Sequence, residues 1–132
     1  MAPPSPIVIA SRYRVIEEIG RGGMGVVYLV KHENTGEYHA VKVLHESEVS
    51  RGETLERFKR EMRLPAKIRS DHVAKITDAD VSPELGGAPF LVMELLNGCD
   101  LGKILTKSGA RRPDEVAWIL GQAAKAVEKA HL

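Results

Sequence analysis

The stretch Ile19-Gly-Arg-Gly-Gly-Met-Gly-Val-Val27 decides the fold of this chain, because it places three glycines at the spacing G-x-G-x-x-G-x-V. The same glycine spacing marks dinucleotide-binding folds, in which the third glycine opens a helix. Here Gly25 is followed by the β-branched and aromatic run Val26–Val30, which favours a strand. The glycines are therefore predicted to lie at the tip of a β-hairpin.

A lysine that could accompany this loop comes from a later strand. The loop does not end in G-K-[ST], so the Walker-type loop with its own lysine is excluded. Lys42, in Ala40-Val-Lys42, lies on the strand that follows the hairpin. The alternatives are a tight hairpin without a ligand and an exposed strand lysine. Three glycines with backbone N–H groups able to point at phosphate oxygens, together with a strand lysine, favour an ATP phosphate site.

The apolar pattern predicts five strands in succession, over residues 13–19, 26–31, 38–44, 73–81 and 90–94. Asn34-Thr-Gly36 predicts the turn between the second and third strands. A helix is expected over 53–69, in which Pro65 predicts a kink or an early end. A short helix is expected from Asp100 and a longer one over 114–131.

Several segments in a fixed order resemble the N-terminal part of a protein kinase, most closely the bacterial serine/threonine kinases of eukaryotic type. They are the glycine loop, His39-Ala-Val-Lys42, a helix with Arg60-Glu61, and the segment Phe90–Leu101. The resemblance implies an α+β, protein-kinase-like fold, with a five-stranded antiparallel sheet and one packed helix followed by the first helices of a truncated helical large lobe. The implied parts are a flexible lead-in (1–10), a small lobe (11–96) and the beginning of the large lobe (97–132).

The resemblance also implies the site. Lys42 would contact the α- and β-phosphates and form an ion pair with Glu61, both as catalytic residues. Met93 would be the gatekeeper at the back of the adenine site, and Asp100 would contact ribose or serve as a helix N-cap. The Glu94 carbonyl and the Leu96 N–H would bond the adenine edge. The residues implied to bind ATP are Ile19, Gly20, Arg21, Gly22, Gly23, Met24, Gly25, Val26, Val27, Ala40, Lys42, Met93, Glu94, Leu96 and Asp100.

By this resemblance the chain is the ATP-binding portion of a serine/threonine protein kinase that phosphorylates protein hydroxyls with Mg-ATP. The catalytic loop H-R-D-x-x-x-x-N, with the Mg²⁺ ligands, is expected after Leu132, so this chain alone is expected to be inactive. The alternative is a noncatalytic nucleotide-binding or interaction module of the pseudokinase kind. A nucleotide-dependent oxidoreductase is a third possibility, disfavoured by the strand after Gly25.

Composition and charge argue against several other classes of protein, namely nucleic-acid-binding, membrane and metal-binding proteins. The formal net charge is +1, with 19 basic and 18 acidic residues, so no strong field recruits nucleic acid or an anionic membrane. Cys99 is the single cysteine and the five histidines are scattered, so no metal site is expected. No stretch approaches a spanning helix and the N-terminus lacks signal-peptide features, which predicts a cytoplasmic protein without a membrane segment. The sequence does not identify the protein substrate.

Overall fold

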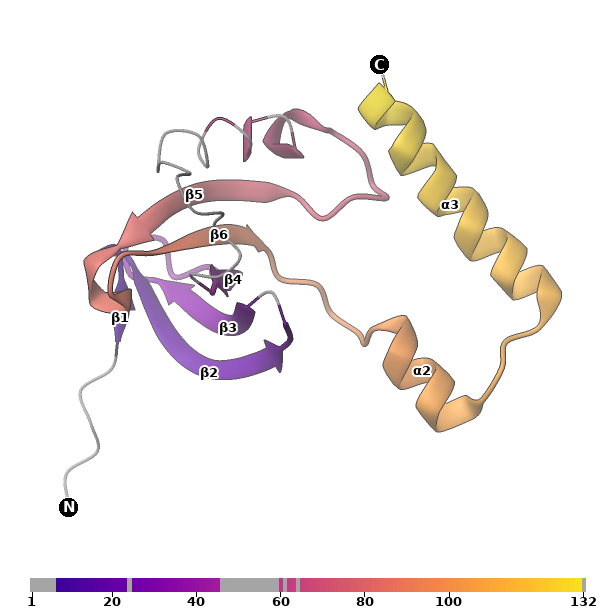
Figure 1. Ribbon diagram of the computed structural model, residues 1–132, viewed down its shortest axis with the longest axis horizontal. Coiled ribbons are helices and arrows are strands. Elements are labelled where there is room, and N and C mark those ends of the chain that lie inside the picture. The colour runs from indigo at the N-terminus through magenta and orange to yellow at the C-terminus, as the bar shows by residue number, and fades with distance from the viewer. Residues whose placement is uncertain (1–6, 24, 46–59, 61, 64, 132) are drawn as a thin grey trace. The chain divides into compact units, whose positions relative to one another are not determined.

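A computed structural model describes residues 7–23, 25–45, 60, 62, 63 and 65–131 of the chain. The chain divides into two compact units, one of residues 1–67 and 75–95 and the other of residues 68–74 and 96–132. The first unit holds the strands and the second holds helices α2 and α3 (Figure 1). The last crossing between the units, after Leu95, lies next to the predicted boundary after residue 96.

The first unit is built on one antiparallel sheet with the strand order β1-β2-β3-β4-β6-β5. The predicted antiparallel arrangement and all five predicted strands are confirmed. The strands are β1 (Val8–Ile9), β2 (Tyr13–Arg21), β3 (Gly25–His32), β4 (Tyr38–Leu44), β5 (Ile76–Ser82) and β6 (Ala88–Glu94). The predicted turn between β3 and β4 is also confirmed, with Gly36 at φ 75° and its N–H donating to the His32 carbonyl over 2.8 Å.

The prediction was wrong in two places. Residues 7–10 were assigned to a flexible lead-in, but Val8–Ile9 form a sixth strand and Ile9 is fully buried. The apolar run Ile7-Val-Ile9, directly after the proline-rich start of the chain, is the sequence signal for this strand. Strand β5 begins at Ile76 rather than at Val73, because Val73 belongs to a turn in which its N–H donates to the Ser70 carbonyl over 3.3 Å.

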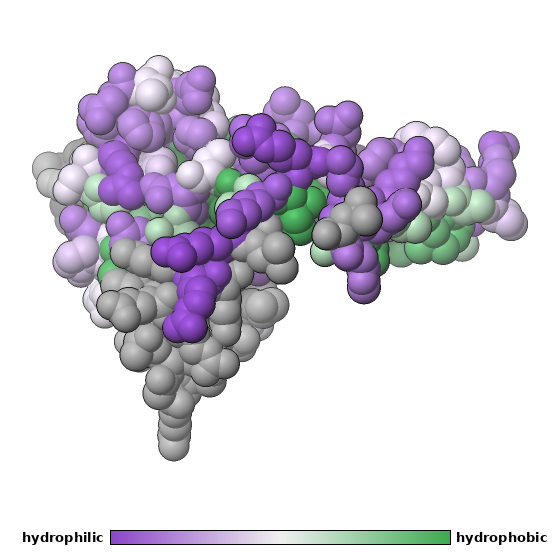
Figure 2. Space-filling view, turned by 90° about the horizontal axis from the view of Figure 1, so that it is seen from above, coloured by the Kyte–Doolittle hydropathy of each residue, from purple (hydrophilic) through white to green (hydrophobic). Residues whose placement is uncertain are grey.

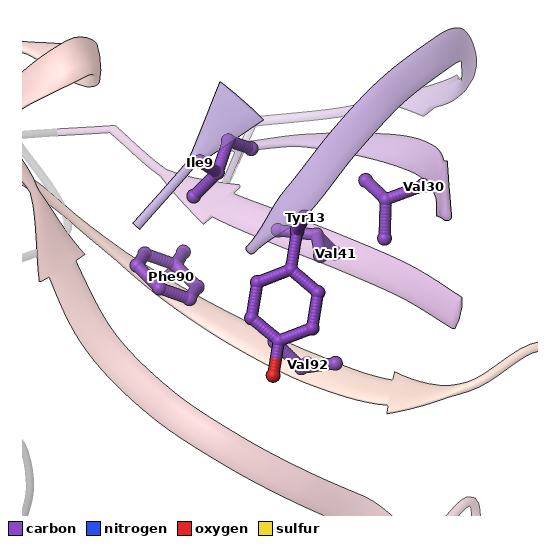
Figure 3. Packing of buried hydrophobic residues seen from close by; sticks show 6 residues of the cluster. All are labelled: Ile9, Tyr13, Val30, Val41, Phe90 and Val92. Carbon is purple, nitrogen blue, oxygen red and sulfur yellow. The ribbon is translucent and has the colours of Figure 1, made fainter. Parts of the chain in front are cut away.

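The hydrophobic core lies on one face of the curled sheet. Side chains alternate along a strand, so Val41 and Val43 point to one face of β4 and Ala40 and Lys42 point to the other. Val41 is fully buried in the core, and Val43 packs against it. The six core residues in Figure 3 come from five strands and are Ile9, Tyr13, Val30, Val41, Phe90 and Val92. Each such side chain, once buried, stabilises the fold by about 1.5–3 kcal/mol.

Polar contacts tie the start of β2 to the far edge strand β5. The Arg12 guanidinium and the Tyr13 hydroxyl both donate to one Asp78 carboxylate oxygen, over 2.7 and 2.8 Å. Burial raises the pKa of Asp78, but the bonds from Arg12 and Tyr13 outweigh that effect and hold the pKa below its ordinary value. The buried Ser82 hydroxyl accepts the Ala10 N–H over 3.3 Å and donates to Glu84. These bonds close the curl of the sheet around the core.

The predicted helix over 53–69 is described only in part. Residues 60, 62, 63 and 65–67 are helical, so the helix does not end at Pro65 and instead ends two residues before the predicted Arg69. Glu61 lies outside the described residues.

The second unit confirms both predicted helices. Helix α2 (Leu101–Ser108) begins after Asp100, whose carboxylate accepts the Lys103 N–H over 2.7 Å and so serves as the predicted N-cap. Helix α3 (Pro113–His131) has Pro113 in its first turn and no buried residue. Its hydrophobic side chains reach the surface, with Trp118 69% and Leu120 63% exposed, and green patches mark the helical part in Figure 2.

Candidate functional site

The glycine loop connects β2 and β3 as a hairpin, as predicted, and no helix follows Gly25. Arg21 pairs with Val26 in the last rung of the ladder, and the Gly22 N–H donates to the Gly25 carbonyl over 2.9 Å. This result supports the phosphate-loop interpretation over a dinucleotide-binding loop, which would need a helix at this point. Met24 lies outside the described residues.

The glycines of the loop have different steric surroundings. A Cβ built on Gly25 would lie 2.1 Å from the Val43 carbonyl oxygen, so this glycine is needed for the close approach of β3 to β4. A Cβ on Gly20 would make only ordinary contact with Val27, at 3.7 Å. Gly22 and Gly23 have nothing within 4 Å of such an atom. The packing of β3 against β4 thus requires glycine at position 25. At Gly22 and Gly23 no such packing exists, and the space beside the loop backbone is open.

The strand register brings four predicted site residues to one face of the sheet. Val27 on β3 lies directly opposite Lys42 on β4, and Ala40 on β4 lies directly opposite Met93 on β6. Residues directly opposite each other in an antiparallel sheet point to the same side, and so do Ala40 and Lys42, two positions apart. This face is turned away from the core that contains Val41. We call it the Lys42 face, defined by Val27, Ala40, Lys42 and Met93.

The sequence-based prediction missed one residue of this face. Leu91 lies opposite Lys42 and two positions from Met93, so it is on the Lys42 face as well. Lys42 is thereby flanked by Val27 on one side and Leu91 on the other and is partly buried, unlike an ordinary exposed strand lysine. The alternation along Phe90–Glu94 contained the signal for Leu91, but only the β4–β6 register identifies its neighbour.

Other predicted residues do not share the Lys42 face. Val26 lies opposite Val43, is buried, and points to the core side of the sheet. Ile19 is the extra residue of a β-bulge between Glu18 and Gly20, and it is 41% exposed. Leu96, 66% exposed, and the N-cap residue Asp100 belong to the second unit.

Arg21 is engaged by a neighbouring carboxylate. Its guanidinium donates to both oxygens of Glu18, over 2.7 and 3.3 Å, across the bulge at Ile19. The hydrogen bond from Arg21 holds the pKa of Glu18 below its ordinary value. Both side chains are solvent-exposed, so the pair contributes little stability, but it neutralises the one cationic side chain among the described loop residues.

Glu94 ends β6 in an unusual contact with Lys75, the residue before β5. The Glu94 N–H donates to the Lys75 carbonyl over 2.9 Å, while the Lys75 N–H donates to Glu94 Oε1 over 3.1 Å. On its other side Glu94 lies opposite His39 of β4. Both the backbone and the side chain of Glu94 therefore bind the backbone of Lys75.

The ion pair between Lys42 and Glu61 stays a prediction, because Glu61 is outside the described residues. Within the described part of the chain, no group of three or more His, Cys, Asp or Glu side chains could hold a metal ion. The described residues therefore do not form a Mg²⁺ site by themselves. None of the described helices has the length and apolar character needed to cross a membrane.

Comparison with known proteins agrees with this geometry. The family described as protein kinase domain matches residues 13–132. The chain belongs to the protein kinase family. The serine/threonine-protein kinase pkn2 of Myxococcus xanthus is 36% identical over 99% of the chain, and PknA of Mycobacterium tuberculosis is 33% identical over 99%. The family and the resemblance to bacterial serine/threonine kinases are thus confirmed.

A solved structure supports the kinase fold directly. The kinase domain of Mycobacterium tuberculosis PknI superposes with a TM-score of 0.81 at 29% identity, over 98% of this chain and 52% of that domain. The chain also covers 15% of pkn2 and 31% of PknA, less than a third of either curated relative. The kinase fold is therefore established for a region about half as long as the PknI domain.

Proposed function

We propose that this chain supplies the ATP-binding part of a serine/threonine protein kinase, which transfers the γ-phosphoryl group of Mg-ATP to a hydroxyl of a protein substrate. The Lys42 face carries the proposal, because β-strand register alone places a lysine, two small or branched apolar residues and Met93 on one side of the sheet. Family membership and the names of the relatives support the reaction class.

The proposed roles follow from this arrangement. The Lys42 ammonium contacts the α- and β-phosphates, and Glu61 pairs with it. The open backbone at Gly22 and Gly23 admits phosphate oxygens close to the loop N–H groups. Val27 and Ala40 contact the faces of the adenine ring, with Ile19 as a further apolar contact, and Met93 lies behind it. The Glu94 carbonyl and Leu96 N–H bond the adenine edge, and Asp100 adds a ribose contact to its N-cap role.

The remaining parts of the reaction require residues outside this chain. Positions 1–132 contain no H-R-D or D-F-G sequence, which carry the base and the Mg²⁺ ligands in the family. Mg²⁺, once bound by such groups, neutralises charge on the β- and γ-phosphates. A cytoplasmic location is part of the proposal, because the reaction draws on the ATP of that compartment.

Calorimetry on Lys42→Met tests the phosphate role. The methionine keeps the apolar stem and removes the ammonium, so ATP should lose about 1.5–3 kcal/mol of binding free energy, the range of a hydrogen bond to a charged group. Adenosine, which has no phosphates, should bind almost unchanged. Lys31→Met is the matched control, since Lys31 is an exposed strand lysine whose ammonium lies over the Tyr38 ring at 5.7 Å.

Two outcomes would contradict the proposal. Equal losses for ATP and adenosine in Lys42→Met would show that Lys42 does not contact phosphate, and absence of ATP binding to the unmodified protein would remove the ATP-binding role. The alternative function, a noncatalytic nucleotide-binding module, would also bind ATP but would not transfer phosphate. An assay of labelled γ-phosphate transfer to protein by the complete gene product distinguishes the two functions.

A further inference from the structure

A β-bulge brings Glu18 and Arg21 to the same face of β2. In a regular strand, residues three positions apart point to opposite faces. Ile19 is the extra residue of the bulge, so Glu18 lies opposite Tyr28 and Arg21 lies opposite Val26. Tyr28 and Val26 are two positions apart on β3 and share a face, and the residues opposite them share it too.

This face is the core side of the sheet, turned away from the Lys42 face. Val26 is buried on the core side, and Tyr28 packs against the core cluster. The guanidinium of Arg21 is therefore bound by Glu18 on the side of the sheet opposite to Lys42. The proposed phosphate contacts then fall to Lys42 and to the loop backbone.

The ion pair spans the bulge at the base of the glycine loop. Arg21 donates from Nε to Glu18 Oε1 over 2.7 Å and from Nη2 to Oε2 over 3.3 Å, so both carboxylate oxygens are engaged. A bulge interrupts the ladder of backbone hydrogen bonds, and the pair bridges that interruption. Beyond it, the Gly22 N–H binds the Gly25 carbonyl, while a Cβ built on Gly22 or Gly23 would meet nothing within 4 Å. The direction of the loop backbone therefore depends on how firmly its base is held.

We propose that Glu18 and Arg21 are positioning residues for phosphate binding: their ion pair fixes the strand on both sides of the bulge and holds the loop N–H groups toward the phosphates. This inference rests on the proposed function, in which the glycine loop binds the phosphates of ATP. A loop that is already ordered loses less conformational entropy when a ligand binds to it. The pair therefore strengthens the binding of ATP more than that of adenosine, which lacks phosphates.

Simple electrostatics predicts the opposite effect for Glu18. Its carboxylate is a negative charge at the base of the loop that the triphosphate would occupy, so Coulomb repulsion alone would make its removal strengthen ATP binding. The positioning role requires that removal to weaken ATP binding. A merely structural role, in which the pair only stabilises the sheet, would leave the affinities of the folded protein for ATP and adenosine unchanged.

The test measures the dissociation constants for ATP and adenosine by calorimetry, in the unmodified protein and in its variants. Glu18→Ala should raise the constant for ATP about twofold to fivefold, the factor that an exposed ion pair supplies. The constant for adenosine should change less, since adenosine reaches this segment only through Ile19. The double variant Glu18→Arg/Arg21→Glu reverses the pair and should bring the ATP constant back toward that of the unmodified protein. Glu33→Ala is the matched control, because it removes the exposed pair that Glu33 forms with Arg14 over 2.8 Å at the other end of β2, and it should change neither constant.

Hydrogen exchange gives a second readout that needs no nucleotide. The Gly22 amide is bonded to the Gly25 carbonyl, and loosening the base of the loop should open that bond more often. Its exchange rate should rise about twofold to fivefold in Glu18→Ala, the same factor as above. The Glu33→Ala control should leave this rate unchanged.

The outcomes separate this inference from the proposed function. Unchanged or tighter ATP binding in Glu18→Ala overturns the inference alone, and so does an equal loss for ATP and adenosine or an unchanged exchange rate at Gly22. A reversed pair that binds ATP as weakly as Glu18→Ala overturns it as well. If the unmodified protein binds neither ligand, the proposed function is overturned and this inference with it. Should Glu18→Ala fail to fold, Glu18→Thr, which keeps a β-branched side chain on the strand, replaces it with the same expected losses.

Discussion

Replacing Gly25 with alanine tests the claim that this glycine serves the sheet rather than the phosphates. The new Cβ would lie 2.1 Å from the Val43 carbonyl oxygen and 3.1 Å from the Leu44 Cα, both of them backbone atoms. The oxygen would have to retreat by about 0.9 Å to reach 3.0 Å, below which real Cβ contacts essentially do not occur. No side-chain rotation can relieve this clash, so β3 and β4 must separate.

The expected cost follows from that separation. Overpacking by one methyl group costs about 1–3 kcal/mol, and a backbone clash lies at the upper end or beyond. The pairs Gly25–Leu44 and Val26–Val43 end the β3–β4 ladder and would be lost or strained. We therefore expect Gly25→Ala to lower the free energy of unfolding by about 3 kcal/mol or more, a large part of the about 5–15 kcal/mol typical of a domain.

Urea unfolding followed by circular dichroism measures this change, with Gly23→Ala as the matched control. Nothing lies within 4 Å of a Cβ built on Gly23, and its φ is not in the left-handed region. The control should be as stable as the unmodified protein or up to about 1 kcal/mol more stable, because alanine reduces the entropy of the unfolded chain. Equal stabilities of the Gly25 and Gly23 variants would refute the close approach of β3 to β4.

Two further predictions concern the closure of the sheet. The bonds from Arg12 and Tyr13 lower the pKa of Asp78, so the stability that this carboxylate contributes is present above the ordinary aspartate pKa of 3.8 and is lost as the pH falls through the lower folded value. Asp78→Asn should therefore flatten the decline of the unfolding free energy in acid, and an unchanged acid decline in urea titrations would contradict this role. Ser11 has φ 59° in the β1–β2 turn, where a Cβ is unfavourable, so Ser11→Gly should be about 1 kcal/mol more stable than Ser11→Ala, and the reverse order in urea would contradict the turn geometry.

Local sequence patterns determined the hairpin at the glycine loop, the five main strands and both helices of the second unit. Each rests on interactions between near neighbours in the chain: β-branched runs, a Gly-containing turn at Gly36, and the N-cap at Asp100. The family resemblance then selected Lys42 among many lysines. Alternation along the strand at 38–44 is enough to put Ala40 and Lys42 on one face, because the strand period is two.

Only the tertiary structure decided which residues of different strands meet. The β4–β6 register places Leu91 beside Lys42 and Met93 beside Ala40, although about 50 residues separate them in the chain. The strand at Val8–Ile9 exists because pairing with β2 and burial in the core outweigh the weak preference of so short a segment. The bond from Lys75 to the Glu94 carboxylate likewise joins segments 19 residues apart. Such contacts depend on long-range pairing and burial, which no local pattern of residues specifies.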